Sequence, residues 1–152
     1  MADPLGFFFN GKGMQLNLPT GGELDLNSKV LQTGNFKITP VTVTTTDNTV
    51  TTVLTVSCPA SRTVAAWVFG AANAEDTSDD GLVAFVYNAV KNAAGTTAVV
   101  GASGGSNVES GAGSPAVTVV ADNSADTLLV RVLGETSKTY NWNLIIVTCE
   151  IA

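Results

Sequence analysis

The 152-residue sequence predicts an all-β fold: a single antiparallel β-sandwich or jelly-roll-like domain of about eight strands with an extended N-terminal arm. Composition is the first reason, because Gly, Thr and Val recur throughout while charged residues make up only 13% of the chain. The second reason is a period-two alternation of apolar residues from Val41 onward. Clusters of Gly, Asn, Asp and Ser separate the alternating segments, as turns do in antiparallel sheets.

A change of pattern at residue 40 predicts two units, an N-terminal arm with short edge strands (1–40) and the β-sandwich domain (41–152). The apolar alternations of the arm are too brief to make an independent sheet. Three adjacent phenylalanines near its start need cover, and aromatic anchors are common at interfaces. The arm therefore has two interpretations, as edge strands of the main domain or as a segment that lies on a capsid or a neighbouring subunit. The candidate contact residues are Phe7, Phe8, Phe9, Leu16 and Leu18.

The first strands of the domain are predicted as a hairpin. Residues 41–46 alternate, Asp47 and Asn48 supply a turn, and residues 50–58 form the returning strand. Residues 62–70 follow as a strand with three side chains on each face. One face carries Val64, Ala66 and Val68, and the other carries Ala65, Trp67 and Phe69.

The middle of the chain continues the same pattern. Residues 81–91 predict a strand buried on both faces in its middle, because Val, Phe and Tyr favour a strand over the alternative helix. Residues 96–101 predict a short strand, and the Gly- and Ser-rich segment 102–114 predicts a loop. Two further strands, 115–122 and 126–134, are joined by a turn at Asn123 and Ser124.

The closing segment 139–152 is apolar on both faces of its predicted strand. Such a strand belongs inside a sheet, and we expect it to pair with residues 127–133 across a short polar turn. Trp142 in this strand and Trp67 earlier in the chain both stand among apolar residues, so we expect both to pack in the core.

Catalytic and cofactor chemistry finds little support in the sequence. The chain has no histidine, which removes the commonest general base and zinc ligand. Neither a G-x-S-x-G elbow nor a phosphate- or dinucleotide-binding glycine motif occurs. Cys58 and Cys149 match no metal or redox spacing, and we expect buried free thiols, with a disulfide as the alternative in an oxidising medium. The sequence predicts a protein that is not an enzyme and uses no cofactor.

One acidic cluster is the weak candidate for a Ca²⁺ site, and its members are Glu75, Asp76, Asp79 and Asp80. Loop carboxylates are suitable Ca²⁺ ligands, but the spacing differs from that of an EF-hand. A glycosidase acid pair is a second interpretation, with no aromatic sugar platform beside it. We therefore favour a solvated acidic turn between strands and expect no bound metal.

Charge and hydropathy exclude further classes. The formal net charge is −6 and the basic residues are scattered, so we expect no nucleic-acid partner. No apolar segment reaches the roughly 20 residues of a membrane span, and we expect no membrane partner. The first 13 residues lack the basic and apolar regions of a secretory signal, which predicts synthesis in the cytoplasm without a signal peptide.

The closing segment 121–152 resembles the closing hairpin of structural proteins of tailed-bacteriophage virions. In those proteins an L-x-V-x-V-x-G strand is followed by a polar turn and then x-N-W-x-x-x-V-x-x-x-E-[IV]. The matching residues are Leu128, Val130, Val132, Gly134, Asn141, Trp142, Val147, Glu150 and Ile151. Leu133 before Gly134 departs from the pattern. The segment 22–39 is similar to strand-and-turn entry segments of the same class.

This resemblance implies a virion structural protein. The compact size and the N-terminal arm are similar to head decoration (cement) proteins, which sit on the capsid surface as trimers at local three-fold positions. The implied partners are the major capsid protein and further copies of the chain in a homotrimer, after synthesis in the host cytoplasm. The alternative is a tail-fibre or receptor-binding tip protein whose loops 75–81 or 101–114 contact host surface glycans.

Overall fold

The computed structural model describes residues 35–75, 80–110 and 114–151 in full, and the strand backbone alone for 6–10, 13–17 and 31–33. The described residues form strands and turns with no helix, which confirms the predicted all-β class. None of them forms a helix with the length and apolarity that a membrane crossing requires.

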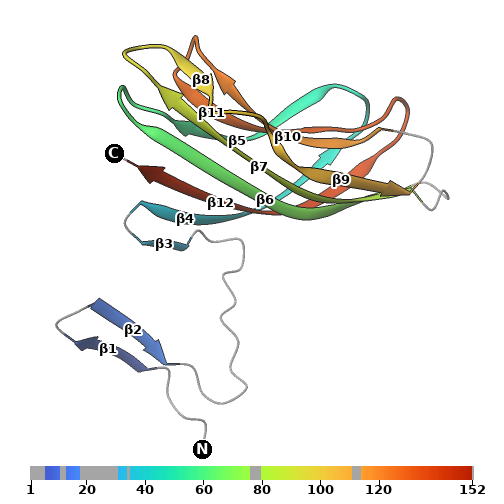
Figure 1. The fold of residues 1–152 in the computed structure, drawn as a ribbon. Coiled ribbons are helices and arrows are strands. Elements are labelled where there is room, and N and C mark those ends of the chain that lie inside the picture. The colour runs from blue at the N-terminus through green and yellow to red at the C-terminus, as the bar shows by residue number, and fades with distance from the viewer. Residues whose placement is uncertain are drawn as a thin grey trace, which may run out of the picture.

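The strands belong to three antiparallel sheets (Figure 1). The first is a two-stranded sheet of β1 (Gly6–Asn10) and β2 (Gly13–Asn17). The second has seven strands: β3 (Leu31–Thr33), β4 (Phe36–Thr45), β12 (Tyr140–Ile151), β6 (Thr63–Ala74), β7 (Gly81–Asn92), and both β8 (Thr97–Val99) and β9 (Gly104–Ser110) paired with β7. The third has three strands: β10 (Ala116–Asp122), β11 (Thr127–Leu133) and β5 (Val50–Ser57).

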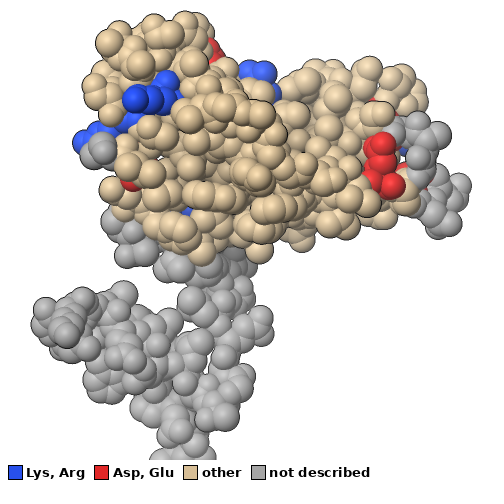
Figure 2. All heavy atoms as spheres, in the orientation of Figure 1, with Lys and Arg blue, Asp and Glu red and all other residues tan. Residues whose placement is uncertain are grey.

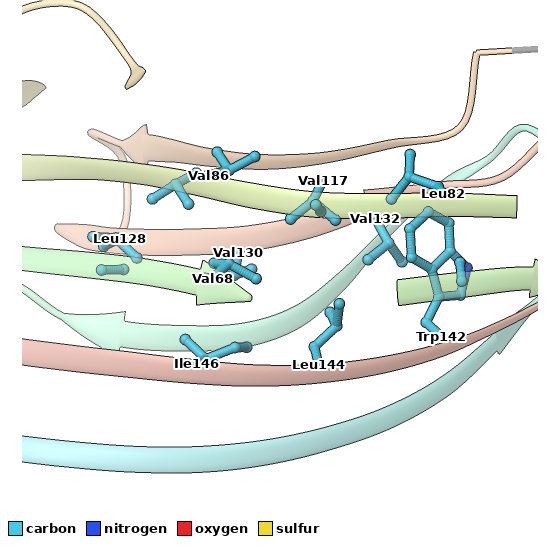
Figure 3. Close-up of a cluster of buried hydrophobic side chains, with 14 of the residues drawn as sticks. Val68, Leu82, Val86, Val117, Leu128, Val130, Val132, Trp142, Leu144 and Ile146 are labelled. Atoms are coloured by element: carbon cyan, nitrogen blue, oxygen red, sulfur yellow. The ribbon is translucent and has the colours of Figure 1, made fainter. Parts of the chain in front are cut away.

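The three-stranded sheet lies over one face of the seven-stranded sheet, and the core fills the space between them (Figure 1). Figure 3 shows Val68, Leu144 and Ile146 of the larger sheet together with side chains of β10 and β11. Trp142 and Tyr140 are the largest side chains that are fully buried. The nine strands from β4 to β12 therefore make a β-sandwich, close to the about eight strands that we expected.

The alternation that predicted the strands is the alternation that builds this core. In β6, Val64, Ala66 and Val68 share one face, as expected from their period-two spacing, and the structure buries that face. In β12 every second residue from Tyr140 to Ile146 is likewise buried. In a helix the same residues would point in several directions, so the period-two alternation predicts strands and an all-β fold.

Strand pairing corrects two expectations. β5 does not return beside β4 but pairs with β11, so the turn after Thr45 carries the chain from one sheet to the other. β12 does not pair with β11 either; it lies between β4 and β6, which confirms only that it is an interior strand. Turn residues reverse the chain direction, but they do not specify which sheet receives the next strand.

Gly134 marks the last crossing between the two sheets, from β11 to β12. A Cβ at this position would lie 2.5 Å from Thr45 Oγ1 and 2.6 Å from the Asp47 carbonyl oxygen. Only glycine lets the chain that leaves β11 pass this close to the turn that leaves β4.

The predicted loop at 102–114 is wrong over most of its length, because residues 104–110 form β9 along β7. Its side chains are exposed or half-buried, so no alternation of burial marked the strand in the sequence. Asn107 joins β9 to the other sheet: its Nδ2 donates to the Val117 carbonyl (3.2 Å) and its Oδ1 accepts from the Val117 N–H (3.0 Å). Asn88 Nδ2 similarly donates to the Val119 carbonyl at 3.2 Å. These amides satisfy backbone groups of β10 that have no strand partner on that side.

Candidate interaction surface

The face of the seven-stranded sheet that points away from the core is the candidate functional surface, and we call it the outer sheet face. The strand register aligns its residues in rows across β4, β12, β6, β7 and β9. The central row is Pro40, Ile145, Phe69, Phe85 and Ser106. On one side lies the row of Ile38, Val147, Trp67, Tyr87 and Gly104, and on the other the row of Thr42, Asn143, Ala71, Val83 and Val108.

Large apolar side chains on this face are open to solvent. Val83 and Val108 are each 63% exposed and Ile145 is 51% exposed. Phe69 and Phe85 retain 44% and 43% of their surface. The expectation that 81–91 is buried on both faces is therefore wrong, because nothing in the described chain covers the outer side of β7.

The two tryptophans have different environments. Trp142 is fully buried, as expected, and its Nε1 donates to Thr45 Oγ1 at 2.9 Å. Trp67 lies on the outer sheet face and is only half-buried, so its predicted place in the core is wrong. The parity of the strand decides this difference, since Trp67 alternates with the buried Ala66 and Val68.

Aromatic rings form a continuous group at the centre of the face. The Phe69 and Phe85 rings stack with centroids 5.0 Å apart, and Phe85 lies 5.6 Å from Tyr87. A 5.0 Å separation is close to the spacing between neighbouring strands, about 4.8 Å, so stacked rings on adjacent strands stand upright on the sheet. Their edges, not their flat faces, are turned towards solvent.

Gly104 on β9 makes room for the tyrosine of this group. A Cβ at Gly104 would collide with the ring of Tyr87, and Gly104 lies opposite Tyr87 in the strand register. The tyrosine ring therefore lies across the backbone of the edge strand, which broadens the aromatic group by one strand.

No charged residue occurs in these three rows, or in the rows that flank them. The flanking rows are Phe36, Cys149, Ala65 and Ala89 towards one end of the strands, and Thr44, Asn141, Asn73, Gly81 and Ser110 towards the other. In Figure 2 the sandwich shows a broad uncharged expanse, with blue atoms gathered towards one end and red atoms towards the other.

The end of the sheet beside the turn that precedes β12 holds an ionic cluster. Lys138 Nζ contacts Asp80 and lies 2.9 Å from Glu135 Oε2, while Tyr140 donates from its hydroxyl to Glu135 Oε1 at 3.0 Å. Hydrogen bonding to Asp80 and then Glu135 raises the pKa of Lys138, and burial raises the pKa of Tyr140 to about 12. Both groups keep their protons at neutral pH, and the cluster ties the turn before β12 to Asp80.

The acidic cluster predicted from the sequence is described only in part. Glu75 Oε1 accepts a hydrogen bond from Asn141 Nδ2 at 2.6 Å and Asp80 contacts Lys138, whereas Asp76 and Asp79 lie outside the described residues. Among residues 35–75, 80–110 and 114–151 no group of three or more His, Cys, Asp or Glu side chains could hold a metal ion. The weak Ca²⁺ site remains a sequence-based prediction.

Most of the predicted contact residues of the arm also lie outside the described residues. Phe7, Phe8 and Phe9 are in β1, and the register places Phe7 opposite Leu16 of β2. The side chains of these four residues, and Leu18 entirely, lie outside the described residues. β4 begins at Phe36, so the last residues of the predicted arm segment belong to the seven-stranded sheet.

The cysteines are both free thiols. Cys58 is buried, with its Sγ 3.5 Å from the Arg62 carbonyl oxygen, and Cys149 is half-buried on β12. Comparison with protein-family models, with curated proteins and with solved structures finds no match for this chain.

Proposed function

We propose that the chain is a non-enzymatic structural protein of a bacteriophage virion, a decoration protein that binds the head surface and stabilises the capsid lattice. The outer sheet face is the observation that supports an assembly role. Monomeric proteins seldom expose contiguous apolar patches beyond about 300–600 Å², and patches of that size are often interaction sites.

The geometry of the aromatic group favours a protein partner over a glycan. Sugars stack on the flat face of an exposed ring, but the stacking contact occupies one face of Phe69 and one face of Phe85. Upright rings and aliphatic neighbours such as Ile145 and Val83 offer ridges into which another protein surface packs.

The virion assignment rests on the resemblance of the closing strand to phage structural proteins. Its Trp142 and Val147 lie on β12, at the centre of the sheet. In this proposal the sandwich is the rigid outer part of the protein, and the arm with Phe7–Phe9 grips the capsid lattice.

Immunogold labelling of intact virions from a producing culture tests the proposal, with antibody raised against the purified chain. Gold over the heads supports a decoration protein, and gold confined to the tail tip supports the receptor-binding alternative instead. Particles without gold, in a lysate that contains the protein, would overturn the virion assignment.

A truncation separates the arm from the sandwich. Removing residues 1–13 should abolish binding to capsids in a cosedimentation assay while leaving the melting temperature of the sandwich nearly unchanged. Capsid binding that survives the truncation would show that the arm is not the attachment.

A further inference from the structure

We infer that the outer sheet face is the contact surface between two copies of this chain, packed face to face about a two-fold axis. The inference deepens the proposed function, since it names the occupant of the surface that supports an assembly role. It differs from the homotrimer that the phage resemblance implies. Three independent features of the face point to it: its extent, its pattern of side-chain size and its distribution of charge.

The extent of the face suits a stable pair. The large exposed side chains of this face leave on the order of 500 Å² of apolar surface open to solvent. They are Phe36, Phe69, Val83, Phe85, Tyr87, Val108, Ile145 and Ile151. Together with the polar rows at its border, this approaches the roughly 800 Å² that each partner contributes to a standard interface. Stacked antiparallel sheets are also how this chain already builds its core.

The sizes of the side chains select one of two symmetric arrangements. The rows beside the central Phe69–Phe85 row differ: one holds Trp67 and Tyr87, and the other holds Ala71 and Val83. A two-fold axis that lies along the strands places each row against itself, bulky on bulky. An axis perpendicular to the strands places the bulky row of one copy on the small row of the other, which allows close packing.

Charge selects the same arrangement. Among the described residues of the seven-stranded sheet and those within two positions of its strands, the two ends carry opposite charge. The basic end has Lys37, Arg62 and Lys91 with one acidic residue, Glu150, and the acidic end has Asp47, Glu75, Asp80 and Glu109 with one basic residue, Lys138. Lys37, Glu150 and Glu109 occupy inner positions of the register. The charged residues at outer positions are Lys91, level with Ile151 at the basic end, and Glu75, which accepts a hydrogen bond from Asn141 at the acidic end. An axis perpendicular to the strands brings the basic end of each copy to the acidic end of its partner, whereas an axis along the strands brings like charges together.

The neutral centre explains why a second copy is the suitable partner despite the net charge of −6. Two identical surfaces meet without like-charge contact only if their centres are uncharged, and the five rows described above carry no charge. The charged rim then sets the orientation, and the apolar centre supplies the affinity.

Sedimentation equilibrium of the purified full-length chain, without capsids, tests the pairing. The expected result is a monomer–dimer equilibrium. Ile145→Lys should raise the dissociation constant at least about 100-fold, because it brings two buried charges together near the axis. Val50→Lys is the matched control: Val50 is 53% exposed and Ile145 51%, but Val50 lies on β5 in the other sheet. Circular dichroism melting verifies that both variants fold.

A charge swap tests the orientation. Lys91→Glu alone should weaken the dimer about threefold, and adding Glu75→Lys should restore it. The two positions lie at opposite ends of the sheet within one copy, so the rescue has to arise between copies. A monomeric or trimeric wild-type protein, equal effects of Ile145→Lys and Val50→Lys, or no rescue by the swap would each overturn the inference. None of these results depends on capsid binding, so the proposed function fails or survives separately.

Discussion

The two faces of the seven-stranded sheet are built from the same strands and are similarly rich in apolar residues, yet the described part of the chain covers only one of them. Leu144 on the inner face is fully buried, while Ile145, the next residue along β12, is 51% exposed. In β7 the same contrast holds between Leu82 and Val83. Hydrophobic composition alone therefore does not place a residue in the core. The position of the three-stranded sheet does so.

The largest expected effect tests this contrast on adjacent residues. Leu144→Ala should lower the free energy of unfolding by about 2–5 kcal/mol, because it leaves a cavity in the core. Ile145→Ala should lower it by less than about 1 kcal/mol in the monomer, where its side chain meets solvent. Urea unfolding at a protein concentration that keeps the chain monomeric measures both. Equal losses would mean that the outer face is covered within the chain.

A smaller effect concerns two glycines with positive φ, one in β9 and one in the turn between β7 and β8. Gly105 has φ +106° and Gly95 has φ +88°, so alanine is strained at both positions, by about 1 kcal/mol or more. A Cβ at Gly105 would also collide with the Phe85 carbonyl group, whereas nothing lies within 4 Å of a Cβ at Gly95. Gly105→Ala should therefore cost about 2–3 kcal/mol and Gly95→Ala about 1 kcal/mol. Thermal unfolding of the two variants compares them, and a milder effect at Gly105 would contradict the β7–β9 pairing.

The inner face stays covered partly because Asn107 ties β9 to β10. Asn107→Ala removes both hydrogen bonds to the Val117 peptide group, which is buried, and should cost about 1–2 kcal/mol. Asn143→Ala, on the outer sheet face, is the control, with an expected change below about 0.5 kcal/mol. Hydrogen exchange at β10 should quicken in the first variant alone. Unchanged protection there would show that the amide bridge does not hold the sheets together.

The smallest effect appears at high pH. The pKa of Tyr140 is raised to about 12 from its ordinary value of 10.0, so the folded protein retains a proton that the unfolded chain loses between these values. The stability from this group is complete below pH 10 and is lost as the pH rises through 12. Tyr140→Phe should make this part of the stability curve less steep. A stability curve as steep as that of the wild type would mean that another group causes the loss of stability at high pH.

The candidate surface illustrates where prediction from sequence stopped. The alternation of 62–70 correctly assigned Val64 and Phe69 to opposite faces, but the apolar residues at both parities of 81–91 predict burial on both sides, which is wrong for the outer side of β7. The available signal was the lack of any Lys, Arg, Asp or Glu at the outer positions of β6 and β12, which a solvated face would normally carry. Even with that signal, the rows of residues across five strands could not be predicted without knowing which strands pair. β12 and β9 come late in the chain and pair with strands that precede them in the sequence.

The sequence by itself determined the all-β class, the turn at Asp47 and Asn48, and which residues of β6 and β12 share a face. These are local properties, because a strand alternates its side chains whatever its partner is. Tertiary structure alone decided that β12 lies between β4 and β6, that β5 joins the other sheet, and that one apolar face is left open by residues 35–75, 80–110 and 114–151. Those outcomes depend on contacts between residues far apart in the chain, and a period-two pattern is the same on either side of a sheet until a second layer covers one of them.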